Sequence, residues 1–416
     1  MRYDTIIVGG GLAGLVCGLR LQQSGKKTAI VSAGQNAMHF SSGAFGLLSR
    51  LEDGTPVDEP LTAIDRLSGE HPYSKIGSER MSVLVREVKP FFEAAGIPLT
   101  GDESRNSYII TPTGNYKKVW LALDDMTLLG GSDSKIGDKI LIVNFKGYLD
   151  FNTAFIAEGL EKRGMKCRIE SVELPEMERL RSNSTEMRSV NIARVLDGGD
   201  AWKHFVASVN RMITDEDTVI LPAVFGFADG SLIRSIREGV RVKTVFIGTM
   251  PPSVPGIRSQ MRLKKAYELS GGTILLGDQA NSPVFDGDRL VSLGTVNMEE
   301  VRLEADNFVI ATGSFFSRGL WATPEKVLEP LLGLDVISSE SRDGWYDEDF
   351  FSPQGYIGFG VRTDNGFHPM RGGRPMENVF AIGSLLGGCN SVKMGCGAGV
   401  AIMTALEVAN TISSSR

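Results

Sequence analysis

Three glycines near the N-terminus have the spacing of a phosphate-binding turn. Gly9, Gly11 and Gly14 form a G-x-G-x-x-G pattern between an apolar run at residues 3–8 and a helical pattern at residues 15–21. The first glycine allows a tight turn, the second lets the backbone approach a pyrophosphate, and the third lets helix and strand pack closely. The helix amides and the positive end of the helix dipole would then hold the phosphate. The motif therefore predicts a nucleotide or flavin phosphate site.

Two later segments have the pattern of buried strands that end in small residues. Residues 308–310 lead into Ala311-Thr312-Gly313, and residues 379–381 lead into Ile382-Gly383-Ser384. Because ligands bind outside the carboxyl ends of strands in an open parallel sheet, we expect both turns beside the first glycine motif. The glycine-rich residues 395–399 then open a helix whose free amides could face an anionic or electron-rich group. Each feature alone is typical of a tight buried turn, but together they predict one shared site.

A loop of small residues follows the second expected strand. Residues 38–46 include His39 and the run Ser41-Ser42-Gly43, and small residues suit a loop that lies close to a ligand. The residues expected to contact a cofactor are Gly9, Gly10, Gly11, Leu12, Ala13, Gly14, Ser32, Ser41, Ser42, Gly43, Ala311, Thr312, Gly313, Gly383, Ser384, Gly395, Gly397 and Ala398.

Strand and helix patterns alternate along the rest of the chain. We expect helices at residues 75–95, 151–163, 185–196 and 257–269, and buried strands at residues 28–31, 139–145 and 218–221. Three short strand patterns at residues 273–276, 290–293 and 300–303 suggest a small antiparallel set.

Composition limits the class of protein. The chain has 416 residues, which predicts two or three domains, and its 42% hydrophobic and 23% charged residues are ordinary for a soluble globular protein. The net charge is −6, with no basic stretch, which argues against nucleic-acid binding. Residues 5–21 are apolar but rich in glycine and lack a basic leader, so we expect neither a signal peptide nor a membrane anchor.

The cysteines and two of the histidines carry no recognisable chemistry in the sequence. The four cysteines are scattered, which favours a reduced, cytoplasmic protein. Cys389 and Cys396 lie seven residues apart, a spacing that matches no metal-binding pattern, so we expect two buried small residues and no metal. His71 and His204 stand in polar surroundings and are expected to be exposed.

The three strand ends together resemble the pattern of glutathione-reductase-type flavoproteins. The segments HFSSG, residues 39–43, and FGVRTD, residues 359–364, are similar to the fumarate reductase and succinate dehydrogenase flavoprotein branch. This resemblance implies an α/β fold in which a glutathione-reductase-type, Rossmann-like flavin-binding domain carries an inserted α+β cap or substrate domain. The flavin-binding domain would comprise residues 1–50, 251–335 and 377–416. The cap and partner-facing domain would comprise residues 51–250 and 336–376.

A more specific resemblance extends over nearly the full length. The chain is similar to the B subunits of anaerobic glycerol-3-phosphate dehydrogenases in the segments MRYDTIIVGGGLAGLVCGLRL, HFSSG, HPYS, PPSVPGIR, ATGSFFSRGL, GLDV, AIGSLLGG and MGCGAGV. It implies a respiratory enzyme that oxidises glycerol 3-phosphate to dihydroxyacetone phosphate and passes electrons through a flavin toward quinone. The implied partners are a catalytic A subunit that contains FAD and an iron–sulfur C subunit that anchors the complex at the inner membrane. An electron-relay or structural subunit without substrate oxidation of its own is the alternative.

Two positions depart from the pattern of FAD-binding relatives. An acidic residue normally ends the second strand and holds the adenosine ribose, but Ser32 stands there. The resemblance also implies an acidic residue for the ribityl chain after Gly383, where this chain has Ser384. Both departures favour FMN over FAD, in agreement with the resembled B subunits, while FAD remains the alternative because backbone groups can replace a carboxylate.

The implied alcohol oxidation requires a base near the hydroxyl and a cation for the substrate phosphate. His39, on the loop after the second strand, and His368, which follows the FGVRTD segment, are the candidate bases, with Arg362 beside them in the catalytic set. Arg188 and Arg258 are the candidate phosphate ligands, because arginine binds phosphate through a planar fork of donors.

Overall fold

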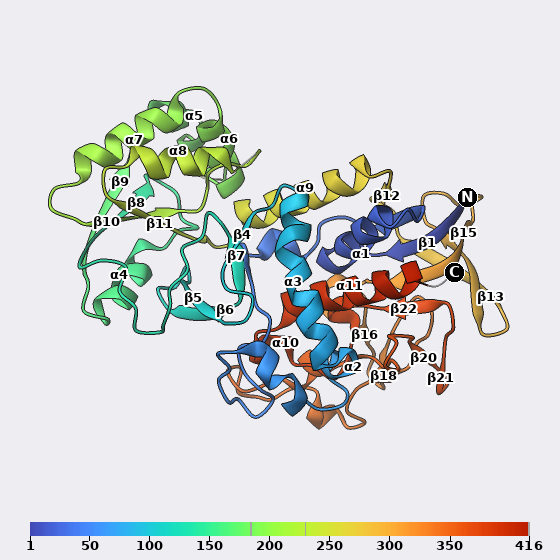
Figure 1. Cartoon of the computed structure of the whole chain (residues 1–416). Coiled ribbons are helices and arrows are strands. Elements are labelled where there is room, and N and C mark those ends of the chain that lie inside the picture. Colours follow the sequence, from blue (N-terminus) through green and yellow to red (C-terminus); the bar gives the residue numbers. More distant parts are fainter. Residues whose placement is uncertain (184, 229, 415–416) are drawn as a thin grey trace. The chain divides into compact units, whose positions relative to one another are not determined.

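The computed structural model describes residues 1–183, 185–228 and 230–414, and the chain divides into two compact units. The first unit comprises residues 1–37, 46–96 and 262–416. The second comprises residues 38–45 and 97–261. Figure 1 shows the chain coloured along the sequence, from blue at the N-terminus to red at the C-terminus.

The first unit is built on a sheet that has seven strands in the described part of the chain. The strand order is β12-β2-β1-β15-β14-β13, and β22 pairs with β15. Strands β12, β2, β1, β15 and β22 are parallel, whereas β14 and β13 run antiparallel beside β15. The bounds are Arg2–Val8 (β1), Thr28–Ser32 (β2), Thr273–Leu276 (β12), Ala280–Asp286 (β13), Arg289–Thr295 (β14), Leu303–Ile310 (β15) and Val379–Ala381 (β22).

Two apolar helices pack against each other beside this sheet. Helix α1, Leu12–Gln23, follows β1 directly, and helix α11, Gly397–Ser414, follows β22 through the short helix α10, Ser391–Met394. Nearly every residue of β1 and β2 is buried, as expected for strands of a parallel sheet that is covered on both faces. The expected helix at residues 75–95 is two helices, α2 (Pro72–Ile76) and α3 (Ser78–Ala94), which break at Gly77 with φ of +85°.

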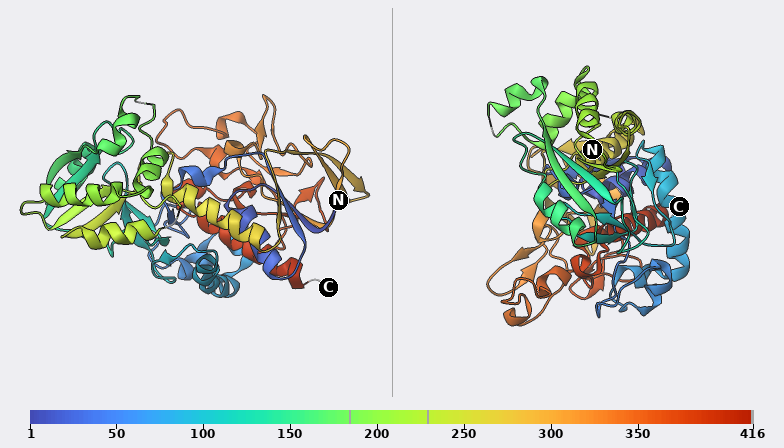
Figure 2. Two further views of the ribbon diagram at one scale, coloured as in Figure 1. Left: turned by 90° about the horizontal axis from the view of Figure 1, so that it is seen from above. Right: turned by 90° about the vertical axis from the view of Figure 1, so that its left-hand side faces the viewer.

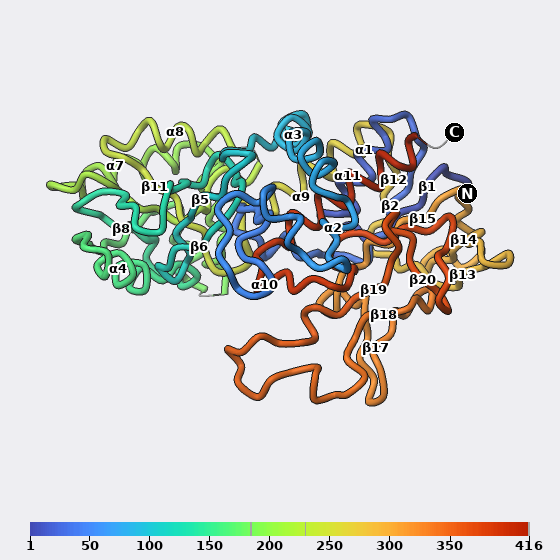
Figure 3. The backbone as a smooth tube through the Cα atoms, turned by 60° about the horizontal axis from the view of Figure 1, so that its bottom comes forward, coloured from blue at the N-terminus to red at the C-terminus, as the bar shows by residue number. Residues whose placement is uncertain are grey.

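Residues 311–378 of the first unit form loops, short 3-10 helices and two-residue strands, and Figure 3 shows part of this segment projecting from the unit as a long loop. The short strands are Trp321–Ala322 (β16), Val327–Leu328 (β17), Val336–Ile337 (β18), Gly360–Val361 (β19), Met370–Arg371 (β20) and Arg374–Pro375 (β21). They pair as β16 with β17, β18 with β19, and β20 with β21, each antiparallel.

The second unit contains a separate parallel sheet in the order β11-β10-β8-β9. Its strands are Lys139–Phe145 (β8), Lys166–Val172 (β9), Thr218–Pro222 (β10) and Lys243–Ile247 (β11). Helix α4 (Thr153–Glu161) lies on one side of this sheet, and α7 (Ala201–Met212) and α8 (Ser231–Gly239) lie on the other (Figure 1). The short α5 (Glu178–Arg181) and α6 (Ser189–Asp197) precede α7.

Short strands complete the second unit. Strands Ala44–Phe45 (β3), Leu121–Leu123 (β7) and Leu99–Thr100 (β4) form one antiparallel set, and Ser107–Ile110 (β5) pairs with Tyr116–Val119 (β6). The division between the units falls inside helix α9, Val254–Leu269, which runs as one continuous helix (Figure 2).

Several expected elements differ from the observed ones. Residues 273–276 form an edge strand parallel to β2 and not part of an antiparallel set, because residues 29–32 offer them a parallel partner. Residues 300–303 do not form a strand of their own; Leu303 begins β15. Residues 51–96 and 336–376 were expected in the cap domain. In the structure they lie in the first compact unit. The insertion was expected to be α+β, whereas its main sheet is parallel with helices between its strands.

Candidate functional site

The carboxyl ends of β1, β15 and β22 lie side by side in the first unit. Val8 pairs with Ile310, and Ile310 pairs with Ala381. The backbone continues this order beyond the strands, because the amide of Ala311 donates to the carbonyl of Val8 at 2.8 Å. The amide of Ile382 likewise donates to the carbonyl of Ile310 at 3.1 Å. The predicted arrangement of the three turns is therefore confirmed.

Two glycines of the first turn are needed for packing within the chain itself. Gly9 has φ of +120°, and a methyl group on it would lie 2.2 Å from the carbonyl oxygen of Ala311. A methyl group on Gly14 would lie 1.9 Å from the carbonyl oxygen of Gly9. Backbone occupies both positions, so neither contact could be relieved by moving a side chain.

Gly11 is different, because no described part of the chain fills the space in front of it. A methyl group there would lie 4.0 Å from its nearest neighbour, the Cβ of Asn36. Gly11 is the N-cap of α1 and provides no side-chain cap, so the first amides of the helix are not satisfied by it. Open space beside free amides at the positive end of a helix fits a phosphate group.

The second and third turns contribute small and polar groups to the same edge. Gly313 has φ of +81°, and a methyl group on it would lie 3.4 Å from the hydroxyl of Ser384. The hydroxyl of Thr312 is buried and has no hydrogen-bond partner among the described residues. A methyl group on Gly383 would lie 2.8 Å from the Cβ of Ala13, which joins the third turn to the start of α1. An unsatisfied hydroxyl at this edge fits a polar ligand.

The start of α11 is shaped by one packed glycine and one open glycine. Gly395 has φ of +62°, and a methyl group on it would lie 2.7 Å from the hydroxyl of Ser49. Gly397 is the first residue of α11, and a methyl group on it would make an ordinary contact with Ser391 at 3.6 Å and, among the described residues, with no other. Ala398 follows and is half-buried. This helix start lies in the same unit as the three turns.

The loop of small residues at 38–45 belongs to the second unit, where it packs against the first turn of α9 and the segment that precedes this helix. A methyl group on Gly256 would lie 1.9 Å from the carbonyl oxygen of Met38, and one on Gly248 would lie 3.2 Å from the Cβ of Ser42. Ser41 accepts a hydrogen bond from the amide of Gly43 at 3.3 Å. The structure thus brings together two motifs, residues 39–43 and 251–258, that are far apart in the sequence.

Ser32 ends β2 as expected, and its surroundings contain an acid that the sequence did not point to. The carbonyl of Ser32 accepts hydrogen bonds from the amides of Gly277 and Asp278 at 2.7 and 3.2 Å. The carboxylate of Asp278 in turn accepts from the amides of Gln279 and Asn297 at 2.8 and 2.9 Å. Burial raises the pKa of Asp278, but the hydrogen bonds to its carboxylate outweigh burial and lower it. Asp278 is thus an ionised acid already engaged with backbone.

The two candidate bases, His39 and His368, lie in different units and differ in their hydrogen bonds. His39 is half-buried in the second unit, and its carbonyl accepts from the amide of Ser253 at 2.8 Å. His368 lies in the first unit, where its Nδ1 contacts the carbonyls of Met376 and Val379 at 3.0 and 3.1 Å. Because both neighbours are carbonyl acceptors, this Nδ1 must carry a proton. Its hydrogen bonds stabilise the segment that leads into β22.

The three arginines predicted to contact the substrate differ in how exposed they are and in which groups they bind. The Arg362 side chain is half exposed, and its nearest acid is Glu70 at 3.7 Å. Arg188 is also half exposed and donates through Nη1 to Asp150 at 3.1 Å. Arg258 is buried in the second unit, where it donates to Asp125 at 2.7 Å and to the carbonyls of residues 225 and 226. Because the Arg258 side chain is 6% exposed and its donors are already bound, Arg258 is unsuited to contact a substrate phosphate.

Sequence reasoning missed a cluster of three buried side chains in the first unit. His71, Cys389 and Cys396 place their nitrogen and sulfur atoms within 4.8 Å of one another. The expectation that His71 is exposed was wrong, because this side chain is fully buried. The expectation that both cysteines are buried is confirmed. His204 is exposed, as expected, and pairs with Glu176. The glycines beside each cysteine were the one available signal, but spacing alone could not bring in a histidine 318 residues earlier than Cys389.

The glycine turns and the space at Gly11 are typical of a protein that binds the phosphate of a nucleotide or flavin. The profile of the FAD binding domain family matches residues 4–400, so this chain is a flavin-binding oxidoreductase of that family. This result confirms the expected flavoprotein α/β fold.

Relatives narrow the family further. The B subunit of the anaerobic glycerol-3-phosphate dehydrogenase from Pectobacterium atrosepticum is 39% identical over 99% of this chain and 99% of its own. The protein of the same name from Pectobacterium carotovorum subsp. carotovorum is 40% identical over the same shares. This chain belongs to the family of anaerobic glycerol-3-phosphate dehydrogenase B subunits, which confirms the resemblance noted in the sequence.

A 3-ketosteroid delta1-dehydrogenase from Sterolibacterium denitrificans aligns with all of both chains at 11% identity and a TM-score of 0.46. Among the described residues, no helix combines the length and the apolar character needed to cross a membrane.

Proposed function

We propose that the flavin phosphate binds at the Gly9–Gly14 turn and that the bound flavin is FMN. The observation that carries the phosphate site is the open space at Gly11 in front of uncapped helix amides. FMN is supported by Ser32, which stands where an adenosine ribose would meet a carboxylate, while the family match favours FAD. The flavin, when bound, supplies a two-electron acceptor.

The chain's own residues would hold the flavin from several sides. Thr312 and Ser384 offer hydroxyls at the ends of β15 and β22, and Gly397 offers amide donors at the start of α11. Acid release and chromatography of the flavin from the purified chain test this proposal directly. FMN is the expected product, FAD would replace FMN in the proposal, and a chain without flavin would contradict the site.

We also propose that the chain serves a quinone-linked dehydrogenase that converts glycerol 3-phosphate to dihydroxyacetone phosphate and passes the electrons through flavin to partner subunits. The family membership supports this reaction. Arg188 is the remaining phosphate ligand, because both of its contacts with Asp150 use Nη1 and its side chain is half exposed. His39, His368 and Arg362 stay the proposed catalytic residues.

A role in electron relay or in structure, without substrate oxidation, is the second candidate. It is favoured by His368, whose Nδ1 is bound to two carbonyls, and by Arg258, whose guanidinium is buried. Anaerobic addition of glycerol 3-phosphate to the flavin-loaded chain separates the two. Bleaching of the flavin that is lost with Arg188→Ala but retained in Arg188→Lys supports substrate oxidation here, whereas bound flavin that does not bleach supports the relay.

We further propose that residues 336–376 face partner subunits, namely an FAD-containing A subunit and an iron–sulfur C subunit that holds the complex at the inner membrane. This segment exposes large apolar side chains, with Phe350 and Phe351 83% and 91% exposed and Tyr346 60% exposed. Such a patch marks a protein–protein contact more often than a free surface. Co-purification with the A subunit should fail for Phe350→Ser/Phe351→Ser and persist for Val392→Ser, an exposed apolar position outside the segment.

A further inference from the structure

Three buried side chains in the first unit form a site that the flavin does not explain. His71 precedes α2, Cys389 precedes α10, and Cys396 follows α10. Their exposed fractions are 0%, 7% and 0%, and the two sulfur atoms lie 3.2 Å apart. An imidazole next to a thiol is a neighbour that can lower the pKa of the thiol and so activate it, even though burial acts against this.

The surrounding backbone holds these groups together by close packing. Gly388 has φ of +80°, and a methyl group on it would lie 2.6 Å from the carbonyl oxygen of Glu70. This approach sets Cys389 beside His71. On the other side, the hydroxyl of Tyr73 donates to the carbonyl of Leu47 at 2.8 Å, and a methyl group on Gly399 would lie 2.3 Å from that hydroxyl. The start of α2 is thereby packed against the start of α11.

The hydrogen bonds of His71 fix which ring nitrogen carries the proton. The amide of Tyr73 donates to Nδ1 of His71 at 3.0 Å, so this nitrogen must present a lone pair. The proton of the neutral ring therefore sits on Nε2. This Nε2 is buried and has no hydrogen-bond partner among the described residues, and one nitrogen of the ring lies within 4.8 Å of both sulfur atoms. Because the Tyr73 amide occupies Nδ1, Nε2 is the ring nitrogen that can donate to the cysteine pair.

This tautomer disfavours a metal ion at the cluster. A metal bound to Nε2 would need the lone pair there, and the proton would then move to Nδ1, facing the N–H of Tyr73. Within the described chain, the cluster also offers three ligands, whereas a closed structural zinc site has four. The donor at Nε2 suits a sulfur anion instead.

The pKa values of the two thiols are shifted in opposite directions, and the His71 donor favours the ionised form of Cys389. A hydrogen bond from the Cys396 thiol lowers the pKa of Cys389, burial opposes it, and His71 lowers it further, so that the net shift is downward. The same contact with Cys389, together with burial, raises the pKa of Cys396. Cys389 is also the slightly more exposed of the two. The opposite directions of the two shifts make Cys389 the thiol that ionises first and Cys396 the thiol that keeps its proton.

We propose that Cys389 and Cys396 are a redox-active dithiol that closes to a reversible disulfide, with Cys389 as the attacking thiolate, Cys396 as the resolving thiol and His71 as the positioning donor. A small hydroperoxide is the oxidant. The Cys389 sulfur attacks the outer peroxide oxygen, the O–O bond breaks, and the alkoxide or hydroxide leaves and takes up a proton. The Cys396 sulfur then attacks the resulting sulfenic acid, the S–S bond forms, and water leaves with the Cys396 proton.

The other two cysteines serve as internal controls. Burial raises the pKa of Cys17, whose side chain on α1 is fully enclosed. Burial also raises the pKa of the half-buried Cys167, to about 11. Both are neutral thiols at pH 7 and are expected to react slowly.

Peptide mapping of the full-length chain tests the proposal. After about one equivalent of hydrogen peroxide per chain, followed by unfolding, alkylation and digestion without reductant, we expect one peptide pair joined through Cys389 and Cys396. Dithiothreitol should restore both thiols, and Cys17 and Cys167 should be recovered alkylated. Absence of the linked pair after excess peroxide would overturn the proposal, as would stoichiometric zinc whose chelation is needed to free the thiols.

Variants assign the individual roles. In Cys396→Ser, a sulfenic-acid trap should label Cys389, whereas Cys389→Ser should give no label at Cys396. His71→Asn keeps an acceptor for the Tyr73 amide at the start of α2 but removes the Nε2 donor, so disulfide formation at pH 7 should slow about tenfold. Cys17→Ser should react at the rate of the unmodified chain. If His71→Asn also reacts at that rate, the role given to His71 is overturned.

Discussion

The parallel strands of the two main sheets are followed by different kinds of side chain. In the first unit, the strand ends finish in glycine, alanine and hydroxyl residues, and the space before Gly11 is open. In the second unit, Phe145 ends β8 and Phe246 lies near the end of β11, and both join a cluster with Phe205 and Phe225. Ring centroids in this cluster are 4.9 Å apart for Phe145 and Phe205 and 5.7 Å for Phe225 and Phe246.

The difference shows that the architecture alone does not create a cofactor site. Both sheets have parallel strands with crossover helices, but glycines and hydroxyl residues follow β1, β15 and β22 of the first, whereas phenylalanine rings pack together at β8 and β11 of the second. In the second unit, charged side chains form ion pairs with each other, such as Arg258 with Asp125 and Arg168 with Glu216. The side chains at the strand ends therefore separate a binding site from a closed core.

The largest stability effect is expected from breaking the buried pair of the second unit. Asp125→Asn removes the charge that faces the guanidinium of Arg258, whose side chain is 6% exposed. An unpaired buried charge costs about 3–5 kcal/mol, so the free energy of unfolding should fall by that amount in urea titration. A matched change at an exposed pair, Asp306→Asn opposite Arg2, should cost less than about 1 kcal/mol. Equal losses would contradict the closed-core description.

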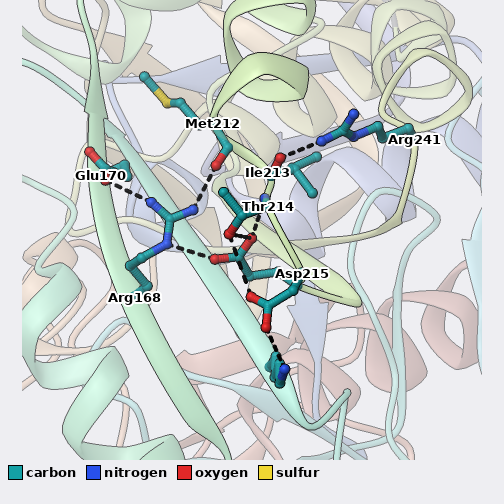
Figure 4. Close-up of polar contacts among 9 residues, drawn as sticks. Arg168, Glu170, Met212, Ile213, Thr214, Asp215 and Arg241 are labelled. Carbon is teal, nitrogen blue, oxygen red and sulfur yellow. Dashed lines mark hydrogen bonds and ion pairs between the residues drawn. The ribbon is translucent and has the colours of Figure 1, made fainter.

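Glu216 should make the free energy of unfolding depend on pH, an effect of intermediate size. Figure 4 shows Arg168 donating to Glu170 and to the carbonyl of Met212, and the same guanidinium donates through Nε to Glu216 at 2.6 Å. Burial raises the pKa of Glu216, but Arg168 and backbone amides outweigh it and lower the pKa to about 2.

A carboxyl whose pKa is lower in the folded state stabilises the fold above its unfolded value, and this stability is lost as pH falls through the folded value. Glu216 should therefore contribute about 3 kcal/mol above pH ~4.5, lost between pH ~4.5 and ~2. Urea titrations at pH 6 and pH 3 measure the effect. Glu216→Gln should flatten this pH dependence, and an unchanged slope in that variant would show that other carboxyls carry it.

The smallest stability effect is expected at Arg188. Its guanidinium is half exposed beside Asp150, so Arg188→Ala should change the free energy of unfolding by less than about 1 kcal/mol. A loss near that of Asp125→Asn would mean that Arg188 is as much a part of the closed core as Arg258. It would then be an unsuitable phosphate ligand.

The sequence predicted the strand ends well because their signal is local. Gly9, Gly11 and Gly14 carry a spacing whose meaning depends on adjacent residues, and strands such as residues 139–145 were predicted with their observed bounds. Parallel pairing of residues 273–276 with β2 was missed, because such pairing joins segments more than two hundred residues apart.

The side-chain chemistry was predicted less well, because it depends on burial and on distant partners. Arg258 was expected to bind phosphate, but Asp125 and two backbone carbonyls use its donors. His71 was expected in solvent, although the polar residues around it in sequence point away from the core that it enters. Neither fact follows from local pattern.

The central claim is that the open space at Gly11 holds the flavin phosphate. Gly11→Val should place its side chain in this space, because among the described residues its Cβ would meet nothing closer than the Cβ of Asn36 at 4.0 Å, whereas Gly14→Val should unfold the turn. The decisive measurement is the flavin content of purified Gly11→Val against the unchanged chain, with the melting temperature of each. We predict a loss of flavin affinity of about a hundredfold with an apo melting temperature within ~3 °C. Full flavin occupancy in a folded Gly11→Val chain would contradict the account.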